Sequence, residues 1–164
     1  MATLTIRRAT PADRPSLRKA YVELQEHERR LHASRLPGEE IADAYVERMI
    51  EQAADAGGVF VAERDGEFLG FAAGWVENSQ NVAETADSNR FGYVSDICVL
   101  VAHRKRGIAR RLLEAMTRMF VEAGVTRVRI GTLADNHLAR LSYEGAGFRP
   151  YEVIYEKALS VRKS

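Results

Sequence analysis

The spacing of apolar residues in the first third of the chain predicts one short strand followed by two helices. Residues 4–8 alternate between apolar and polar positions, which is typical of a strand at the edge of a sheet. The segment Thr10-Pro11-Ala12-Asp13 is a helix start, and apolar residues then recur at helical spacing until Leu36-Pro37-Gly38. A second helical pattern covers residues 41–53 and stops at Gly57-Gly58.

The period changes to that of strands in the middle of the chain. Residues 59–62 and 68–76 are predicted to form two strands around a turn at residues 64–67. Residues 77–89 are polar and predict an exposed loop. Residues 91–101 are apolar on both faces apart from Ser95 and Asp96, which is typical of a central strand.

The last third returns to helical and strand patterns in alternation. A helix is expected to begin near Gly107 and to end at Gly124, followed by a strand over 125–132 and a short helix over 136–144. The full order predicts a single domain, residues 1–164, of mixed α/β class, with a central mixed sheet flanked by helices on both faces. We expect residues 148–159 to form one long strand whose open edge pairs two chains into a homodimer.

Composition narrows the classes of function. Lys and Arg number 24 against 23 Asp and Glu, so the chain lacks the basic excess of a nucleic-acid-binding protein. One cysteine and four scattered histidines give no disulfide, no zinc cage and no metal-ligand spacing. An apolar run of about 18 residues is missing, and the first residues do not form a signal peptide. We therefore expect a cytoplasmic protein without metal, membrane or nucleic acid.

The basic turn after the apolar strand is a candidate anion site. A helix start offers unpaired N–H groups and the positive end of the helix dipole. Five of the eight residues in 104–111 are Lys or Arg, and Gly107 has no Cβ that would keep an anion from the backbone. This pattern predicts binding of a pyrophosphate-sized anion. The alternative is a turn before a helix with arginines that only face solvent.

Two motifs carry a resemblance to a known family. Residues 104–109 match Arg/Gln-x-x-Gly-x-Gly/Ala after an apolar strand, and residues 136–143 match Asn-x-x-Ala-x-x-x-Tyr, followed by Gly147-Phe148. In this order the chain resembles the GCN5-related N-acetyltransferase (GNAT) superfamily over about residues 91–157. The resemblance implies the GNAT-like acyl-CoA N-acyltransferase fold, acetyl-CoA as the donor and a primary amine as the acceptor. A small-molecule acceptor is favoured over a protein amine.

The resemblance also assigns residues to the donor. It places the CoA pyrophosphate at the basic turn and the pantetheine arm along the apolar strand, in the manner of an added strand. The residues so assigned are Arg104, Lys105, Arg106, Gly107, Ile108, Ala109 and Arg110 for the pyrophosphate, and Ile97, Cys98, Val99 and Asn136 for the arm. For Asn136 the alternative is a cap at the start of the short helix.

Two further residues are candidates for proton transfer. Tyr143 lies two helical turns after Asn136, and this spacing alone favours a core aromatic residue. The resemblance implies instead that Tyr143 lies near the thioester sulfur and protonates the departing thiolate. Asp96 is the candidate base, because burial in an apolar strand would raise its pKa. Glu77 and a water chain are the other candidates for the base, and a structurally satisfied Asp96 is the alternative.

Free cysteines are usually buried, and no His or Asn spacing identifies a partner that would activate Cys98, so direct attack of the amine on acetyl-CoA is favoured over an acetylated Cys98. Tyr45 and Trp75 are predicted to be core residues, with lining of an acceptor cleft as the alternative. A different class of function also fits the sequence. In that reading the protein is a CoA-binding sensor or interaction protein that keeps the fold without turnover.

Overall fold

The computed structural model describes residues 3–160, in which five strands form one mixed sheet in chain order. The first three neighbouring pairs are antiparallel and the last pair is parallel. The strands are β1 (Thr5–Arg8), β2 (Gly57–Arg64), β3 (Glu67–Asn78), β4 (Arg90–Val99) and β5 (Val128–Ile130). Residues 1–2 and 161–164 of the predicted domain lie outside this description.

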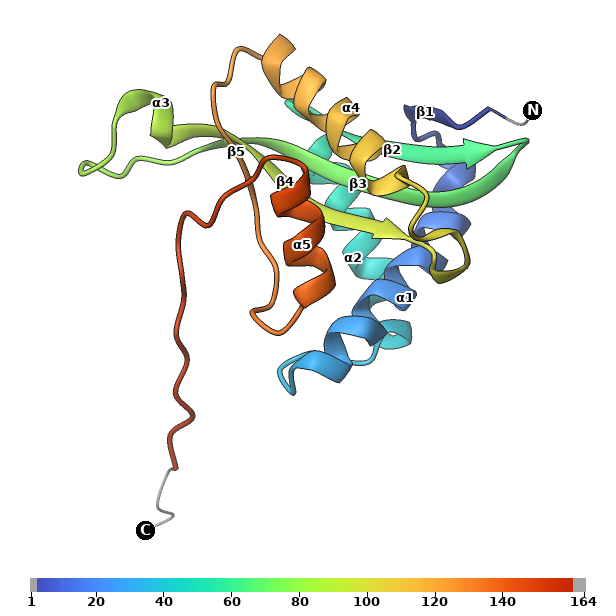
Figure 1. Cartoon of the computed structure of the whole chain (residues 1–164), viewed down its shortest axis with the longest axis horizontal. Helices are drawn as coiled ribbons and strands as arrows, with labels where there is room; N and C mark the ends of the chain where they lie inside the picture. The colour runs from blue at the N-terminus through green and yellow to red at the C-terminus, as the bar shows by residue number, and fades with distance from the viewer. Residues whose placement is uncertain (1–2, 161–164) are drawn as a thin grey trace.

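Helices cover both faces of the sheet, as the sequence predicted (Figure 1). Apolar residues of α1 and α2 pack with Phe71 and Cys98 on one face, and residues of α4 pack with Ala72 and Val94 on the other. The helices are α1 (Arg14–Leu31), α2 (Gly38–Ala53), α3 (Ala86–Asn89), α4 (Ile108–Glu122) and α5 (His137–Gly145), with 3-10 turns at Pro11–Asp13 and Val101–His103. No helix among residues 3–160 combines the length and the apolar character needed to cross a membrane.

Two segments differ from the sequence prediction. The expected loop at 77–89 contains the end of β3 and the short helix α3, whose Ser88 is buried. The expected strand over 148–159 is wrong, because these residues form no strand. A strand needs a neighbour for its N–H and C=O groups, and β5 at the edge of the sheet is only three residues long. The segment therefore leaves the sheet and stays in solvent (Figure 1).

The start of this C-terminal segment is nevertheless fastened to the domain. The guanidinium of Arg129 lies between the rings of Phe91 and Tyr151, at 3.9 Å and 4.4 Å from their centroids. The Tyr151 hydroxyl donates a hydrogen bond to Glu84 at 3.0 Å. After these contacts of Tyr151, the side chains of Ile154 and Tyr155 are almost fully exposed.

A β-bulge in β4 changes which face its side chains occupy. Ala73 of β3 pairs with Asp96, whereas the next residue, Gly74, pairs with Val94, so Ser95 is the extra residue of β4. In an unbroken strand, residues 94, 96 and 98 would share one face. Because of the bulge, Val94 packs under α4 while Asp96 and Cys98 face α1 and α2.

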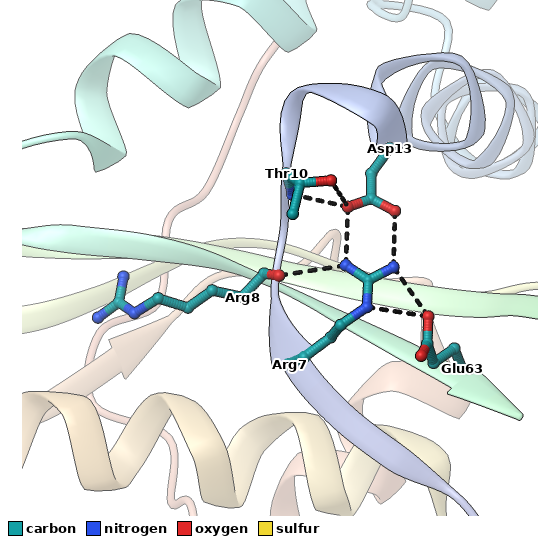
Figure 2. A network of polar contacts seen from close by, with 5 residues as sticks. All are labelled: Arg7, Arg8, Thr10, Asp13 and Glu63. Carbon is teal, nitrogen blue, oxygen red and sulfur yellow. Dashed lines mark hydrogen bonds and ion pairs between the residues drawn. The ribbon is translucent and has the colours of Figure 1, made fainter. Parts of the chain in front are cut away.

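An arginine cluster fixes the entry into α1 (Figure 2). Arg7 of β1 donates to both carboxylate oxygens of Asp13, at 2.8 Å and 2.9 Å, and its Nε donates to Glu63 of β2 at 2.9 Å. Asp13 also accepts the Thr10 backbone N–H at 2.7 Å, which confirms the predicted pairing at the helix start. The Arg7 hydrogen bonds hold the pKa of Asp13 at about 2, below its ordinary 3.8.

Replacing Arg7 by Met is expected to lower the free energy of unfolding by about 2 kcal/mol at pH 7, because the nearly buried Asp13 carboxylate loses its partner. Since the pKa of Asp13 is depressed, its contribution is complete above about pH 4 and is lost as the pH falls toward 2. Urea unfolding at several pH values measures both effects.

Arg18 supplies a matched control, because it is as exposed as Arg7 and also holds two carboxylates, Glu39 and Asp43. Its partners are mostly exposed, so Arg18→Met should cost less than about 1 kcal/mol. Equal losses in the two variants would contradict the importance of burial at Asp13.

Candidate active site

The sheet opens where β4 and β5 diverge. The two strands pair only through residues 92–94 and 128–130, and β4 continues to Val99 without a neighbour on that side. The Cys98 carbonyl lies against Gly70 of β3, so the flanking residues Ile97 and Val99 turn their backbone groups toward the opening. The Val99 carbonyl accepts a hydrogen bond from Arg104 Nε at 2.9 Å. The backbone N–H and C=O of Ile97 and the N–H of Val99 are thus available to pair with a ligand that carries amide groups.

The basic turn places a second set of open backbone groups beside the end of β4. Gly107 is the N-cap of α4 with φ of 74°, and no side chain caps this helix. The first N–H groups of a helix have no partner within it. A Cβ at Gly107 would meet nothing within 4 Å, so glycine is required here by its left-handed backbone rather than by lack of space. Close approach of an anion to the backbone at Gly107 stays a prediction.

The cationic side chains around this turn differ in what they contact. Arg104 is held by Val99 and lies 3.7 Å from a carboxylate oxygen of Glu23, so its side chain shapes the turn. Arg110 pairs with Glu114 at 3.0 Å along α4. Lys105 and Arg106 form no ion pair within residues 3–160. The open N–H groups together with these two cations fit an anion with several charges.

Asp96 is a buried carboxylate beside the opening. Its side chain lies under α1 and α2, and the residue is 7% exposed. The Tyr45 hydroxyl donates to its two oxygens at 3.1 Å and 3.2 Å. Burial raises the pKa of Asp96 to about 6, although hydrogen bonds from Ser95 and Tyr45 oppose the rise. At neutral pH the group is therefore a carboxylate that readily takes a proton.

Tyr143 lies close enough to Asp96 for the charge of this carboxylate to act on its hydroxyl. Its half-buried ring packs against Phe148, with 6.2 Å between the centroids. Burial raises the pKa of the Tyr143 hydroxyl, and the negative charges of Glu28 and Asp96 raise it further. The hydroxyl therefore stays protonated at neutral pH and makes no hydrogen bond to the described part of the chain. The sequence placed Glu28 among the charged residues of the first helix, but it did not connect this acid with Tyr143, because an acid on a helix face carries no distinguishing signal.

Asn136, Cys98 and Glu77 have structural partners. Asn136 Oδ1 accepts the Ala139 N–H at 3.2 Å, so the residue caps α5, which was the alternative reading. The buried Cys98 thiol faces the Ala20 carbonyl, and burial raises its pKa to about 12. A thiol with this pKa is a poor nucleophile at neutral pH. Glu77 accepts a hydrogen bond from Trp75 Nε1 at 2.6 Å.

A cavity of about 250 Å³ lies on the α2 face of the sheet, and Asp96 is not among the residues that line it. The residues that line it include Tyr45, Arg48 and Gln52 of α2, Trp75 of β3, and Tyr93 and Ser95 of β4. Tyr45 connects this cavity to Asp96 through its hydroxyl. Sequence reasoning favoured the core for Tyr45 and Trp75, and it missed Arg48, Gln52 and Tyr93, whose pattern is that of an ordinary helix face and strand.

Comparison with known proteins identifies the class of this chain. A model described as "Acetyltransferase (GNAT) family" matches residues 19–148. The chain therefore belongs to the GNAT family of acetyltransferases, as its two motifs indicated, and its mixed sheet is the fold of that family.

The sequence identity to individual relatives is low. The chain is 27% identical over 100 residues to aminoglycoside N(6')-acetyltransferase type 1 of Salmonella typhimurium, over 60% of this chain and 68% of the relative. It is 32% identical over 65 residues to the chloroplastic GCN5-related N-acetyltransferase 6 of Arabidopsis thaliana, which is 40% of this chain and only 23% of the relative.

Two solved structures share the fold across nearly the whole chain. The aminoglycoside N-acetyltransferase AAC(6')-Iy in complex with CoA has a TM-score of 0.72 at 21% identity, covering 96% of each chain. A tetramutant of the BH1408 protein from Bacillus halodurans has a TM-score of 0.82 at 18% identity, covering 94% of this chain and 99% of the other.

The raised pKa of Asp96 predicts that this carboxylate destabilises the fold. A rise from 3.8 to about 6 corresponds to about 3 kcal/mol at most, since one pKa unit is about 1.4 kcal/mol. The folded state holds more protons than the unfolded state between these values, so stability falls as the pH rises from about 4 to 6. Asp96→Asn should be more stable than the parent by about 1–3 kcal/mol at pH 7 and should lose this slope, as measured by urea unfolding. Asp55→Asn, at an exposed position, is the control, and an Asp96→Asn variant less stable than the parent would contradict the prediction.

Proposed function

We propose that the protein is an N-acetyltransferase that transfers the acetyl group of acetyl-CoA to a primary amine of a small molecule by direct attack in a ternary complex. The observation that carries the proposal is the unpaired edge of β4 at Ile97 and Val99, which lies next to the uncapped start of α4 in a chain of the GNAT family. The aminoglycoside N(6')-acetyltransferase of Salmonella supports a small-molecule amine as the acceptor.

The donor would lie along these two sets of open backbone groups. Its pyrophosphate would accept hydrogen bonds from the N–H groups of residues 105–110, with Lys105 and Arg106 adding positive charge. Its pantetheine amides would pair with Ile97 and Val99 as an added strand does. The backbone groups of Cys98 point toward β3, so Cys98 itself would form no hydrogen bond to the pantetheine arm.

The thioester supplies the acetyl group, and the side chains of this chain manage the protons. Asp96 accepts the proton of the attacking amine, directly or through a water molecule, because its pKa near 6 leaves it ionised and basic at neutral pH. Tyr45 positions the carboxylate through its hydroxyl. Tyr143 stays protonated until the C–S bond breaks and then donates its proton to the departing thiolate. The products are an N-acetylated amine and free CoA.

Two features of the proposal concern the whole protein. The C-terminal segment exposes Val153, Ile154 and Tyr155, and we propose that it pairs with the same segment of a second chain in a homodimer. A cytoplasmic location stays a prediction.

The donor site is tested by two glycines at opposite ends of α4. Gly107 and Gly124 have φ of 74° and 75°, and an added Cβ would contact nothing at either position. Valine at either position therefore imposes a similar backbone strain. We expect Gly107→Val to weaken acetyl-CoA binding at least about tenfold in calorimetry, which is about 1.4 kcal/mol, and Gly124→Val to leave it nearly unchanged. Equal affinities in the two variants would place the donor elsewhere.

The proton transfers predict a pH dependence of turnover. With thiol release as the measure, the rate should fall as the pH drops through about 6, because Asp96 becomes protonated and no longer accepts a proton. In Asp96→Asn this fall of the rate below about pH 6 should disappear, and the rate should be at least about a hundredfold lower than that of the parent. A fall that persists in Asp96→Asn would move the base to Glu77 or to water.

Tyr143→Phe should reduce the same rate while the fall below about pH 6 remains, and Tyr155→Phe, at an exposed position, is its control. Tight acetyl-CoA binding without thiol release for any amine would instead support a CoA-binding sensor.

A further inference from the structure

The cavity that Tyr45 connects to Asp96 has aromatic walls. Trp75 and Tyr93 meet edge to face, with 5.7 Å between their ring centroids and 70° between their planes, and Tyr45 lines the cavity from α2. Tyr45 is itself stacked on Tyr21 at 4.1 Å, so its ring is held in place from behind. Rigid aromatic walls of this kind suit a flat, apolar body.

One cation lines this cavity. Arg48 lies one helical turn after Tyr45, on the same side of α2, and is exposed to solvent. It makes neither an ion pair nor a side-chain hydrogen bond with any residue between 3 and 160. An unpaired guanidinium offers a planar pair of donors that matches a carboxylate.

Three of the five acids of α2 are engaged by α1. The other two, Glu40 and Glu51, form no ion pair within residues 3–160, and neither lines the cavity. Arg18 of α1 binds Glu39 and Asp43 at 2.9 Å each, and Arg14 of α1 binds Glu47. These pairs lie between the two helices. Of the α2 residues that line the cavity, Arg48 is the one that carries a charge, so α2 presents positive charge to the cavity.

No carboxylate is among the residues between 3 and 160 that line the cavity. Asp96 is the proposed base and is bound by Tyr45, and Glu77 accepts the hydrogen bond of Trp75. An acceptor with several ammonium groups would meet the positive Arg48 without a carboxylate in this cavity lining to offset it. An acceptor that carries its own carboxylate would satisfy Arg48.

We propose, on the basis that the protein is an amine acetyltransferase, that its acceptor is an aliphatic primary amine that bears both an aromatic ring and a carboxylate. Its ring lies against Trp75 and Tyr93, its carboxylate pairs with Arg48, and its amine is directed toward Asp96. The acceptor class is therefore that of aromatic amino acids rather than that of polycationic sugars. In the reaction the amine nitrogen forms a bond to the acetyl carbon, the C–S bond breaks, and the amine proton passes to Asp96.

Binding can be measured without turnover, because Trp75 is the only tryptophan of the chain and lines the cavity. Phenylalanine and phenethylamine differ only in the carboxylate, and neither fluoresces like tryptophan. With the protein saturated with CoA, we expect phenylalanine to change the Trp75 fluorescence at a concentration at least about tenfold lower than that needed for phenethylamine. A tenfold difference corresponds to about 1.4 kcal/mol of binding free energy. Arg48→Gln should abolish the difference, and Arg118→Gln, at an exposed position on α4, should keep it.

Turnover gives the second measurement. Thiol release from acetyl-CoA should favour phenylalanine over phenethylamine and over the aminoglycoside kanamycin, mainly through KM, and Arg48→Glu should reverse the preference between the first two. Equal use of both aromatic amines, a preference for kanamycin, or no fluorescence change with phenylalanine would overturn the acceptor class. Such a result leaves the proposed acetyltransferase standing if acetyl-CoA binds and any amine is acetylated. Absence of acetyl-CoA binding would overturn the proposed function itself.

Discussion

The arrangement of the site depends on one extra residue in β4. Side chains of a strand alternate between faces, and Ser95 interrupts this alternation between Val94 and Asp96. Val94 can then complete the core under α4, while Asp96 reaches the Tyr45 hydroxyl on the opposite face. Without the bulge the carboxylate would lie in an apolar layer without that partner. The bulge therefore places the proposed base, Asp96, in the buried environment that raises its pKa.

A second constraint is the short pairing between β4 and β5. Three paired residues hold the strands together, and their divergence exposes backbone groups that a longer β5 would have satisfied. The uncapped start of α4 exposes further N–H groups beside them. Both sets belong to rigid elements, so a ligand that satisfies them loses little to reorganisation of the protein. The same short β5 offers no template to the C-terminal segment.

The arginines of α1 and α2 differ in whether they form ion pairs within the fold. Arg14 and Arg18 of α1 pair with three of the five acids of α2, and Arg7 pairs with Asp13. Arg48 has no ion-pair partner within residues 3–160 and lines the cavity that Tyr45 connects to Asp96. Groups that a fold does not need for its own stability are typical of positions that serve binding or catalysis.

The sequence by itself determined the order of the elements, the helices on both sides of a mixed sheet, and the family, because apolar periodicity and the two motifs are local signals. It also indicated Asp96 and Tyr143, since a lone acid in an apolar strand and a Tyr at fixed helical spacing are visible in one dimension. Only the tertiary structure decided that Asp96 faces Tyr45, that Cys98 turns its backbone to β3, and that Arg48 and Trp75 line one cavity. These facts follow from strand register and from the packing of α2 on the sheet, which join residues far apart in the chain. The final strand was predicted wrongly for the same reason, because a strand exists only where another strand is present to pair with it.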